Sequence, residues 1–293
     1  MLLIAHRLGA AWGPENTLQA FDAARRAGLR AFECDVKLSA DGVPFLLHDD
    51  DLQRTTDQAG RASAQRWSAL ASRVPTLQAL ADAAAPHALT VNLEIKPDAD
   101  AGSARQADWG RRIAGAAARL WAQAAQPPLL SSFSLPALQA AAQAAPQLPR
   151  AWLCAELPSY WREAAQALRL EGVHLCAARE QGAAIAALRA QGLRVRLYTV
   201  NDPAAAAHWR TAGADAVFTD ALVPEPTRTR PPASASSARC RPNSSCCCKS
   251  CSNRARCSCT ASAATTAAAC SATTSCSCCR ASARSPRRPA RPA

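Results

Sequence analysis

The sequence predicts a (β/α)8 barrel, an eight-stranded parallel TIM barrel wrapped by helices, over residues 1–226. Apolar runs of strand length alternate with Ala-rich amphipathic stretches, which is the pattern of a parallel α/β fold. Polar residues cluster at the carboxyl ends of the first few runs, where barrel enzymes carry their chemistry. A doubly wound α/β sheet is the alternative, but the chain contains neither a GxGxxG nor a GxxxxGK[ST] loop.

Nine apolar runs are predicted strands, which is one more than an eightfold barrel needs. The link between Val36 and Val43 is too short for a parallel crossover and contains an Asp41-Gly42 turn signal. The third run is therefore expected to return antiparallel beside the second, as an extra hairpin, which leaves eight strands for the barrel. The predicted strands are 2–6, 31–36, 43–48, 89–95, 128–133, 151–154, 173–176, 193–200 and 216–218.

Helices are predicted between successive barrel strands, because a parallel sheet requires a crossover at each step. The Ala-rich stretches supply one for every interval of the barrel. The predicted helices are 17–27, 77–84, 106–124, 135–144, 161–168, 182–191 and 204–212.

Charge and cysteine divide the chain near residue 226. The formal charge is +12, yet no Asp or Glu follows Glu225, and residues 227–293 carry 12 Lys or Arg and 11 of the 14 cysteines. The first 226 residues hold 22 basic and 22 acidic side chains, so the pI alone does not indicate a nucleic-acid binder. No run of 18 apolar residues and no signal-peptide pattern occurs, and a cytoplasmic protein without a membrane span is expected.

Residues 227–293 are predicted to be a disordered Ala/Ser/Arg/Cys-rich tail, because they contain no Leu, Ile, Val, Phe, Tyr, Trp or Met. Three interpretations compete. Thiolates could bind a metal, and Cys248-x-x-Cys251 is a ligand spacing. The arginines of residues 284–291 could bind nucleic acid nonspecifically. The third is GC-rich DNA translated out of frame, which would leave the tail without an evolved function. The cysteines of the first interpretation are Cys246, Cys247, Cys248, Cys251, Cys257 and Cys259.

Eight ionisable side chains are expected at one mouth of the barrel, because the carboxyl ends of parallel strands meet there. Residues two apart on a strand share a face, and the hairpin returns its last residues to the same rim. These residues are His6 and Arg7 after the first strand, Glu33 and Asp35 on the second, His48 and Asp49 after the hairpin, and Glu94 and Lys96 after the next barrel strand.

Glu33, Asp35 and Glu94 offer three oxygen ligands, which predicts one divalent cation, Mg²⁺ or Ca²⁺, rather than zinc. His6 and His48 are suited to act as general acid and base near neutral pH. The alternative for the carboxylates is simple pairing with the nearby cations.

Arg7 and Lys96 are suited to holding anionic oxygens. Together with a cation and an acid/base pair, this set predicts phosphoryl-ester chemistry. Cys34 lies between two of the acids in sequence, so its side chain is expected on the opposite face of the strand.

Nine collinear motifs resemble the glycerophosphodiester phosphodiesterase family, most of all its cytoplasmic bacterial members. The resemblance covers residues 2 to about 222. The motifs are Ile4-Ala-His6-Arg7, Pro14-Glu15-Asn16-Thr17, Glu33-Cys-Asp35, Leu47-His48-Asp49, Leu52-Gln-Arg54-Thr55-Thr56, Asn92-Leu-Glu94-Ile-Lys96-Pro97, Leu130-Ser-Ser-Phe133, Tyr198-Thr-Val-Asn201 and Phe218-Thr-Asp220.

The resemblance implies a barrel enzyme that hydrolyses a small-molecule glycerophosphodiester to an alcohol and sn-glycerol 3-phosphate, by way of a cyclic phosphate. It implies that His6 and His48 are the acid/base pair, that the three carboxylates hold the ion, and that Arg7 and Lys96 contact phosphate. The remaining candidates for the substrate pocket are Glu15 and Asn16, which are alternatively helix-capping residues, and Phe133, Tyr198 and Asn201, which are alternatively rim-packing residues.

Three features depart from the family pattern. Leu8 stands where the family usually has Gly after the His-Arg pair, and Leu tolerates a positive φ poorly; Gly9 is expected to compensate. The stretch between Trp67 and Pro75 is shorter than the family's covering segment. The final helix expected after Asp220 is replaced by the odd tail.

Two alternative functions follow from these observations. A phospholipase-C-like lyase would stop at the cyclic phosphate, and the departures also allow a catalytically impaired, truncated barrel.

Overall fold

The computed structural model describes residues 1–180 and 182–221. The predicted boundary at residue 226, the tail at 227–293 with its candidate metal-binding cysteines, and the missing final helix all lie outside the described residues. In the described part, the strands are β1 (Leu2–Ala5), β2 (Ala31–Leu38), β3 (Pro44–Leu46), β4 (Thr90–Ile95), β5 (Leu129–Ser132), β6 (Arg150–Cys154), β7 (Gly172–Cys176), β8 (Arg194–Tyr198) and β9 (Ala216–Thr219).

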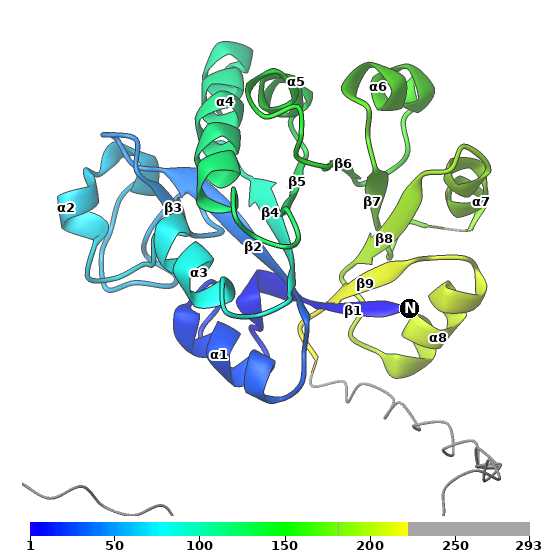
Figure 1. Ribbon diagram of the computed structural model, residues 1–293, viewed down its shortest axis with the longest axis horizontal. Coiled ribbons are helices and arrows are strands. Elements are labelled where there is room, and N and C mark those ends of the chain that lie inside the picture. The colour runs from blue at the N-terminus through cyan, green and yellow to red at the C-terminus, as the bar shows by residue number, and fades with distance from the viewer. Residues whose placement is uncertain (181, 222–293) are drawn as a thin grey trace, which may run out of the picture. The chain divides into compact units, whose positions relative to one another are not determined.

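The helices lie around these strands, as Figure 1 shows. They are α1 (Leu18–Arg26), α2 (Trp67–Leu70), α3 (Leu77–Ala84), α4 (Ser103–Leu120), α5 (Leu135–Ala144), α6 (Trp161–Leu168), α7 (Ala183–Ala190) and α8 (Pro203–Thr211), with the 3-10 turns η1 (His6–Leu8) and η2 (Ala62–Ala64).

The sheet is a closed parallel barrel of eight strands with β3 attached at one edge. Its order is β1-β9-β8-β7-β6-β5-β4-β2-β3, and pairing of β1 with β2 closes the ring. β3 runs antiparallel to β2, with Val36 opposite Leu46. The predicted fold class, including the extra hairpin after the second strand, is confirmed.

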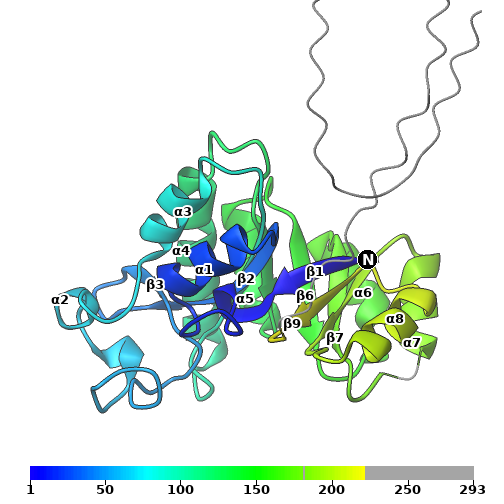
Figure 2. The same ribbon diagram turned by 90° about the horizontal axis from the view of Figure 1, so that it is seen from below.

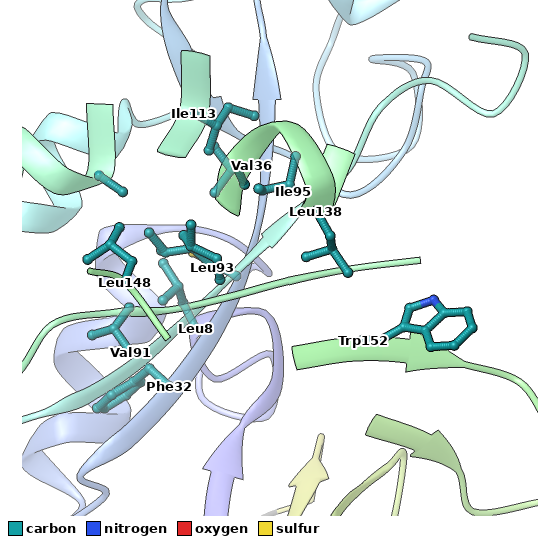
Figure 3. Packing of buried hydrophobic residues seen from close by; sticks show 14 of the residues in the cluster. Leu8, Phe32, Val36, Val91, Leu93, Ile95, Ile113, Leu138, Leu148 and Trp152 are labelled. Atoms are coloured by element: carbon teal, nitrogen blue, oxygen red, sulfur yellow. The ribbon is translucent and has the colours of Figure 1, made fainter. Parts of the chain in front are cut away.

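Alternate residues of β2 face different environments. Phe32, Cys34, Val36 and Leu38 belong to the main core between the barrel and its helices, part of which Figure 3 shows. Glu33 and Asp35 lie on the other face of the strand, and their carboxylate oxygens lie within 4.8 Å of each other. The expectation that Cys34 faces away from the acids is therefore confirmed. Phe32 packs on Phe21 of α1 with ring centroids 4.7 Å apart.

Several helices begin at a side-chain cap. Thr17, Thr76 and Ser134 each accept a hydrogen bond from a backbone N–H of the first turn, and Asp202 accepts two. α4 and α5 approach closely at Gly110, where an added Cβ would lie 2.0 Å from the carbonyl oxygen of Ala137. Only glycine fits at that crossing.

The hairpin carries a small core of its own. It consists of buried side chains from β3 and the segment that follows, and Figures 1 and 2 show this region projecting from the barrel on the side away from α7 and α8. The short stretch after Trp67 forms the one-turn helix α2, which the sequence does not predict because one turn has no periodicity. The cluster contains Phe45, Leu47, Leu52, Ala62, Leu70 and Val74.

None of the helices in residues 1–180 and 182–221 is long and apolar enough to cross a membrane.

Candidate active site

The carboxyl ends of the barrel strands surround a cavity of about 230 Å³. Six of the predicted ionisable residues line it, together with two of the predicted pocket residues. Asp35 lies beneath them and is 1 % exposed. The lining residues are His6, Arg7, Glu33, His48, Asn92, Glu94, Lys96, Phe133, Leu153, Tyr198, Thr199 and Phe218.

The turn η1 places His6 and Arg7 at the mouth. The backbone N–H of Arg7 donates to Glu33 Oε2 over 2.9 Å, and the Arg7 carbonyl accepts from the Asn16 N–H over 2.8 Å. Arg7 has φ 49°, Leu8 has φ 62° and Gly9 has φ 98°. Gly9 thus does not spare Leu8 the left-handed conformation, and the fully buried Leu8 side chain offsets that strain instead.

Three carboxylates meet at the base of the cavity. Glu33, Asp35 and Glu94 are all buried, and each offers an oxygen within 4.8 Å of the others. Burial raises the pKa of Glu33 and of Glu94, and the Asp35 charge raises that of Glu33 further. Burial opposes ionisation of Asp35 too, but the Lys96 ammonium, 3.1 Å from its Oδ1, holds its pKa low.

This cluster fits a divalent cation. Among the described residues, Glu33 Oε1 is buried without a hydrogen-bond partner, and burial of a carboxylate oxygen is costly unless a cation or a donor binds it. The donors are all oxygens, which suits Mg²⁺ or Ca²⁺. Asn16 holds one ligand in place, since its Nδ2 donates to Asp35 Oδ2 over 2.9 Å and its Oδ1 accepts from the Asp35 N–H.

Each cavity histidine is bound through Nδ1 to a carboxylate. His6 Nδ1 lies 2.8 Å from Asp220 Oδ1, and His48 Nδ1 lies 2.6 Å from Asp49 Oδ1. Although burial favours the neutral ring, Asp220 and Glu33 raise the pKa of His6. Burial lowers the pKa of His48, because Asp35 offsets that effect only in part. Two imidazoles of different basicity thus face one cavity.

Asp220 is a site residue to which the sequence analysis assigns no role. The available signal was its position after the last strand, in the Phe218-Thr-Asp220 motif. Closure of the barrel puts β9 beside β1 and so brings Asp220 to His6. Asn201 Oδ1 accepts from the Asp220 N–H over 2.8 Å and from Thr219 Oγ1 over 3.2 Å, so Asn201 shapes this strand end and does not line the cavity.

Glu15 and Asn16 also lie outside the cavity lining. Glu15 accepts hydrogen bonds from Arg7 and from Arg54, another residue to which the sequence analysis gives no role. Thr17 is the residue that caps α1. The Pro14-Glu15-Asn16-Thr17 motif therefore contacts residues of the site through Glu15 and Asn16 without lining the cavity.

On the opposite side of the cavity, the lining residues that the structure describes are all uncharged. Phe133 is 49 % exposed and meets Tyr198 edge-on, with centroids 5.8 Å apart. The Tyr198 hydroxyl donates to the Cys154 carbonyl over 2.9 Å, so its ring rather than its hydroxyl proton faces the cavity. Such a surface suits the apolar body of a small ligand.

A sequence model described as the glycerophosphoryl diester phosphodiesterase family matches residues 6–223. The chain belongs to this family. The mouse protein glycerophosphodiester phosphodiesterase 1 is 35 % identical over 117 residues, which are 34 % of this chain and 35 % of that protein. The match thus spans about a third of the mammalian relative. The Bacillus subtilis protein YqiK is 28 % identical over 236 residues, which cover 74 % of this chain and 94 % of that one.

Solved structures of this family share the fold. An Oleispira antarctica phosphodiesterase in complex with the product sn-glycerol 3-phosphate has a TM-score of 0.68 and 29 % identity, over 75 % of this chain and 93 % of its own. A Thermotoga maritima glycerophosphodiester phosphodiesterase has a TM-score of 0.62 and 25 % identity, over 75 % of this chain and 94 % of its own.

Proposed function

We propose that this chain hydrolyses glycerophosphodiesters to an alcohol and sn-glycerol 3-phosphate in the cytoplasm, as a step of glycerophospholipid breakdown. Family membership supports the reaction class, and the related phosphodiesterase with bound sn-glycerol 3-phosphate supports the product. The observation that carries the proposal is a buried set of three carboxylates, two of which line one cavity together with two carboxylate-bound imidazoles.

The two imidazoles move the protons. Because Asp220 and Asp49 occupy the Nδ1 atoms, each ring leaves Nε2 for the substrate. One ring accepts the proton of the glycerol hydroxyl as its oxygen bonds to phosphorus, and the other donates a proton to the departing alcohol oxygen. Water then opens the cyclic phosphate with the two roles reversed.

Arg7 and Lys96 hold the phosphate oxygens. Both line the cavity, and a guanidinium and an ammonium group are suited to anionic oxygens. Glu33, Asp35 and Glu94 would hold one Mg²⁺ or Ca²⁺ ion, which when bound neutralises charge on the phosphate. Neighbouring Phe133 and Tyr198 would pack against the glycerol or the alcohol.

The test is release of sn-glycerol 3-phosphate from glycerophosphocholine by the purified full-length chain. The assay is run with Mg²⁺, with Ca²⁺ and with chelator, beside His6→Ala. Turnover that requires a divalent ion and is lost in His6→Ala is expected. Absence of turnover from folded, metal-supplied protein would refute the proposal, and accumulation of the cyclic phosphate would identify a phospholipase-C-like lyase instead.

A further inference from the structure

Arg54 bridges two carboxylates that belong to different elements of the rim. Its Nη1 and Nη2 donate to Glu15 Oε2 and Oε1 over 2.9 and 2.7 Å. Its Nε and Nη2 donate to the two oxygens of Asp49, the latter over 3.0 Å. One guanidinium thus satisfies two carboxylates in a fork geometry that an ammonium group does not reproduce.

Both carboxylates in turn hold a residue of the proposed reaction. Asp49 Oδ1 binds the Nδ1 atom of His48, and Glu15 Oε2 accepts from Arg7 Nη1 over 3.0 Å. The contacts therefore form one continuous chain from an imidazole to a phosphate-binding guanidinium, in which Arg54 is the central member.

His48 needs such support because it does not stand on a barrel strand. β3 ends at Leu46, and the hydrogen bond from the Leu47 N–H to the Asp35 carbonyl is the last that ties this segment to β2 before His48. Asp49 is about a quarter exposed, so its carboxylate has room to rotate in water unless a partner fixes it. Arg54 supplies that partner on the same side of the mouth.

The backbone that carries Arg54 is itself anchored. Leu52 is fully buried in the hairpin's core, and the Thr56 N–H and hydroxyl both bond the Leu52 carbonyl, over 3.0 and 2.6 Å. The Arg54 side chain is 47 % exposed. Exposed ion pairs add little to stability, so the network's contribution is orientation rather than folding.

We propose that Arg54 is a positioning residue that holds His48 through Asp49 and Arg7 through Glu15 in the orientation the reaction requires. This inference rests on the proposed function. Loss of the guanidinium frees Asp49 to rotate and leaves Glu15 paired with Arg7 alone, so both reactive groups are displaced together.

The test compares the wild-type chain with Arg54→Ala, Arg54→Lys and the matched control Arg61→Ala. Arg61 lies on the same segment and pairs with exposed Asp100 through Nη1, over 2.6 and 2.8 Å, without touching the site. We expect Arg54→Ala to lower kcat on the order of 10- to 100-fold, as loss of a group that orients an active residue does. KM should change less, and Arg61→Ala should match the wild type.

Two rescue measurements separate positioning from a general structural effect. Guanidinium ion, added well below denaturing concentrations, should restore part of the activity of Arg54→Ala, whereas NaCl at the same ionic strength should not. The kcat of Arg54→Lys should remain close to that of Arg54→Ala, because the lysine ammonium does not reproduce the parallel hydrogen bonds of the guanidinium to two carboxylates.

The second readout does not depend on turnover. The ring ¹⁵N signals of His48, assigned with His48→Gln, should show Nδ1 protonated in the wild type and a mixture of tautomers in Arg54→Ala. An Arg54→Ala kcat within about twofold of that of Arg61→Ala, or unchanged His48 signals, would overturn the proposal. If the wild type itself lacks glycerophosphodiesterase activity, the proposed function fails and the His48 signals alone decide the role of Arg54.

Discussion

The two sides of the cavity differ in kind. One side, the charged wall, comes from the ends of β1, β2, the hairpin and β4, and carries every acidic, basic and imidazole side chain of the lining. The other, the neutral wall, comes from β5, β6, β8 and β9. The charged wall comprises His6, Arg7, Glu33, His48, Glu94 and Lys96, and the neutral wall comprises Phe133, Leu153, Tyr198, Thr199 and Phe218. The difference separates groups suited to chemistry from groups suited to packing.

Backbone strain follows the same division. Among the described residues, four non-glycine residues have positive φ, and Arg7, Leu8 and Asn16 all lie at or beside the charged wall. Such conformations persist only where the surroundings hold them, and they gather at functional sites. Here the Glu33 and Asp35 carboxylates accept the hydrogen bonds that hold two of them.

The largest effect should come from removing a carboxylate of the charged wall. Glu33→Gln should lower glycerophosphodiesterase activity by more than about 100-fold, because the ion loses a ligand. The same change should stabilise the metal-free protein by on the order of 1–3 kcal/mol, because an amide replaces a buried carboxylate whose Oε1 has no hydrogen-bond partner in the described part of the chain. Thermal unfolding with chelator measures the gain.

The control for Glu33→Gln is thermal unfolding with Mg²⁺. The ion should raise the Tm of the wild type and leave that of the variant nearly unchanged. A metal-free variant that melts below the wild type would show that Glu33 is satisfied without a cation, and the charged wall would then be an ion-pair network rather than a metal site.

The stability of the metal-free protein should depend on pH through the same carboxylates. Burial raises the folded-state pKa of Glu33 and Glu94 above the ordinary glutamate value of 4.5, so the folded state binds more protons than the unfolded state. Stability from these groups is therefore present below that value and is lost as the pH rises through the higher folded-state pKa. Between about pH 5 and about pH 8 the Tm advantage of Glu33→Gln in chelator should widen. A Tm difference between Glu33→Gln and the wild type that stays constant or decreases with pH would contradict a raised pKa of Glu33.

The neutral wall should respond differently. Phe133→Ala should raise KM by about 3- to 10-fold with little change in kcat, because the half-exposed ring offers apolar contact and no chemistry. Tyr198→Phe is the matched control and should leave KM within about twofold, since the lost hydroxyl serves the Cys154 carbonyl. Steady-state kinetics on glycerophosphocholine measures both. A fall in kcat for Phe133→Ala comparable to that of Glu33→Gln would mean that the division into two walls is wrong.

Much of the charged wall follows from sequence, because strand periodicity is a local rule. Spacing of two puts Glu33 and Asp35 on one face, and the carboxyl end of a strand locates Glu94 and Lys96. The turn signal at Asp41-Gly42 predicts the hairpin that delivers His48. These features depend on neighbours in the chain and on a fold whose handedness and strand order are restricted.

The supporting residues could not be predicted in the same way. Asp220 reaches His6 from 214 residues away because the barrel closes, and Arg54 meets Glu15 across 39 residues because the hairpin folds back on the rim. No periodicity or spacing in the sequence predicts either contact. Asn201 shows the converse. Its position at a strand end predicts that it lines the pocket, whereas its side-chain Oδ1 accepts hydrogen bonds from the Thr219 hydroxyl and the Asp220 N–H.

The smallest expected effect is the difference in stability between two substitutions of Leu8, which lies beside the charged wall where the family usually has glycine. Backbone strain and side-chain burial oppose each other there: a left-handed Leu costs about 1–2 kcal/mol, and the fully buried side chain is worth about 2–5 kcal/mol when truncated. Burial outweighs strain, so both Leu8→Ala and Leu8→Gly should be less stable than the wild type. The free energy of unfolding of Leu8→Gly should exceed that of Leu8→Ala by about 1 kcal/mol, because glycine adopts the left-handed conformation of residue 8 without strain and alanine does not. Urea unfolding of the three proteins measures both differences. If Leu8→Gly is more stable than the wild type, backbone strain at residue 8 outweighs the burial of its side chain. If Leu8→Gly is less stable than Leu8→Ala, the backbone at residue 8 is not strained.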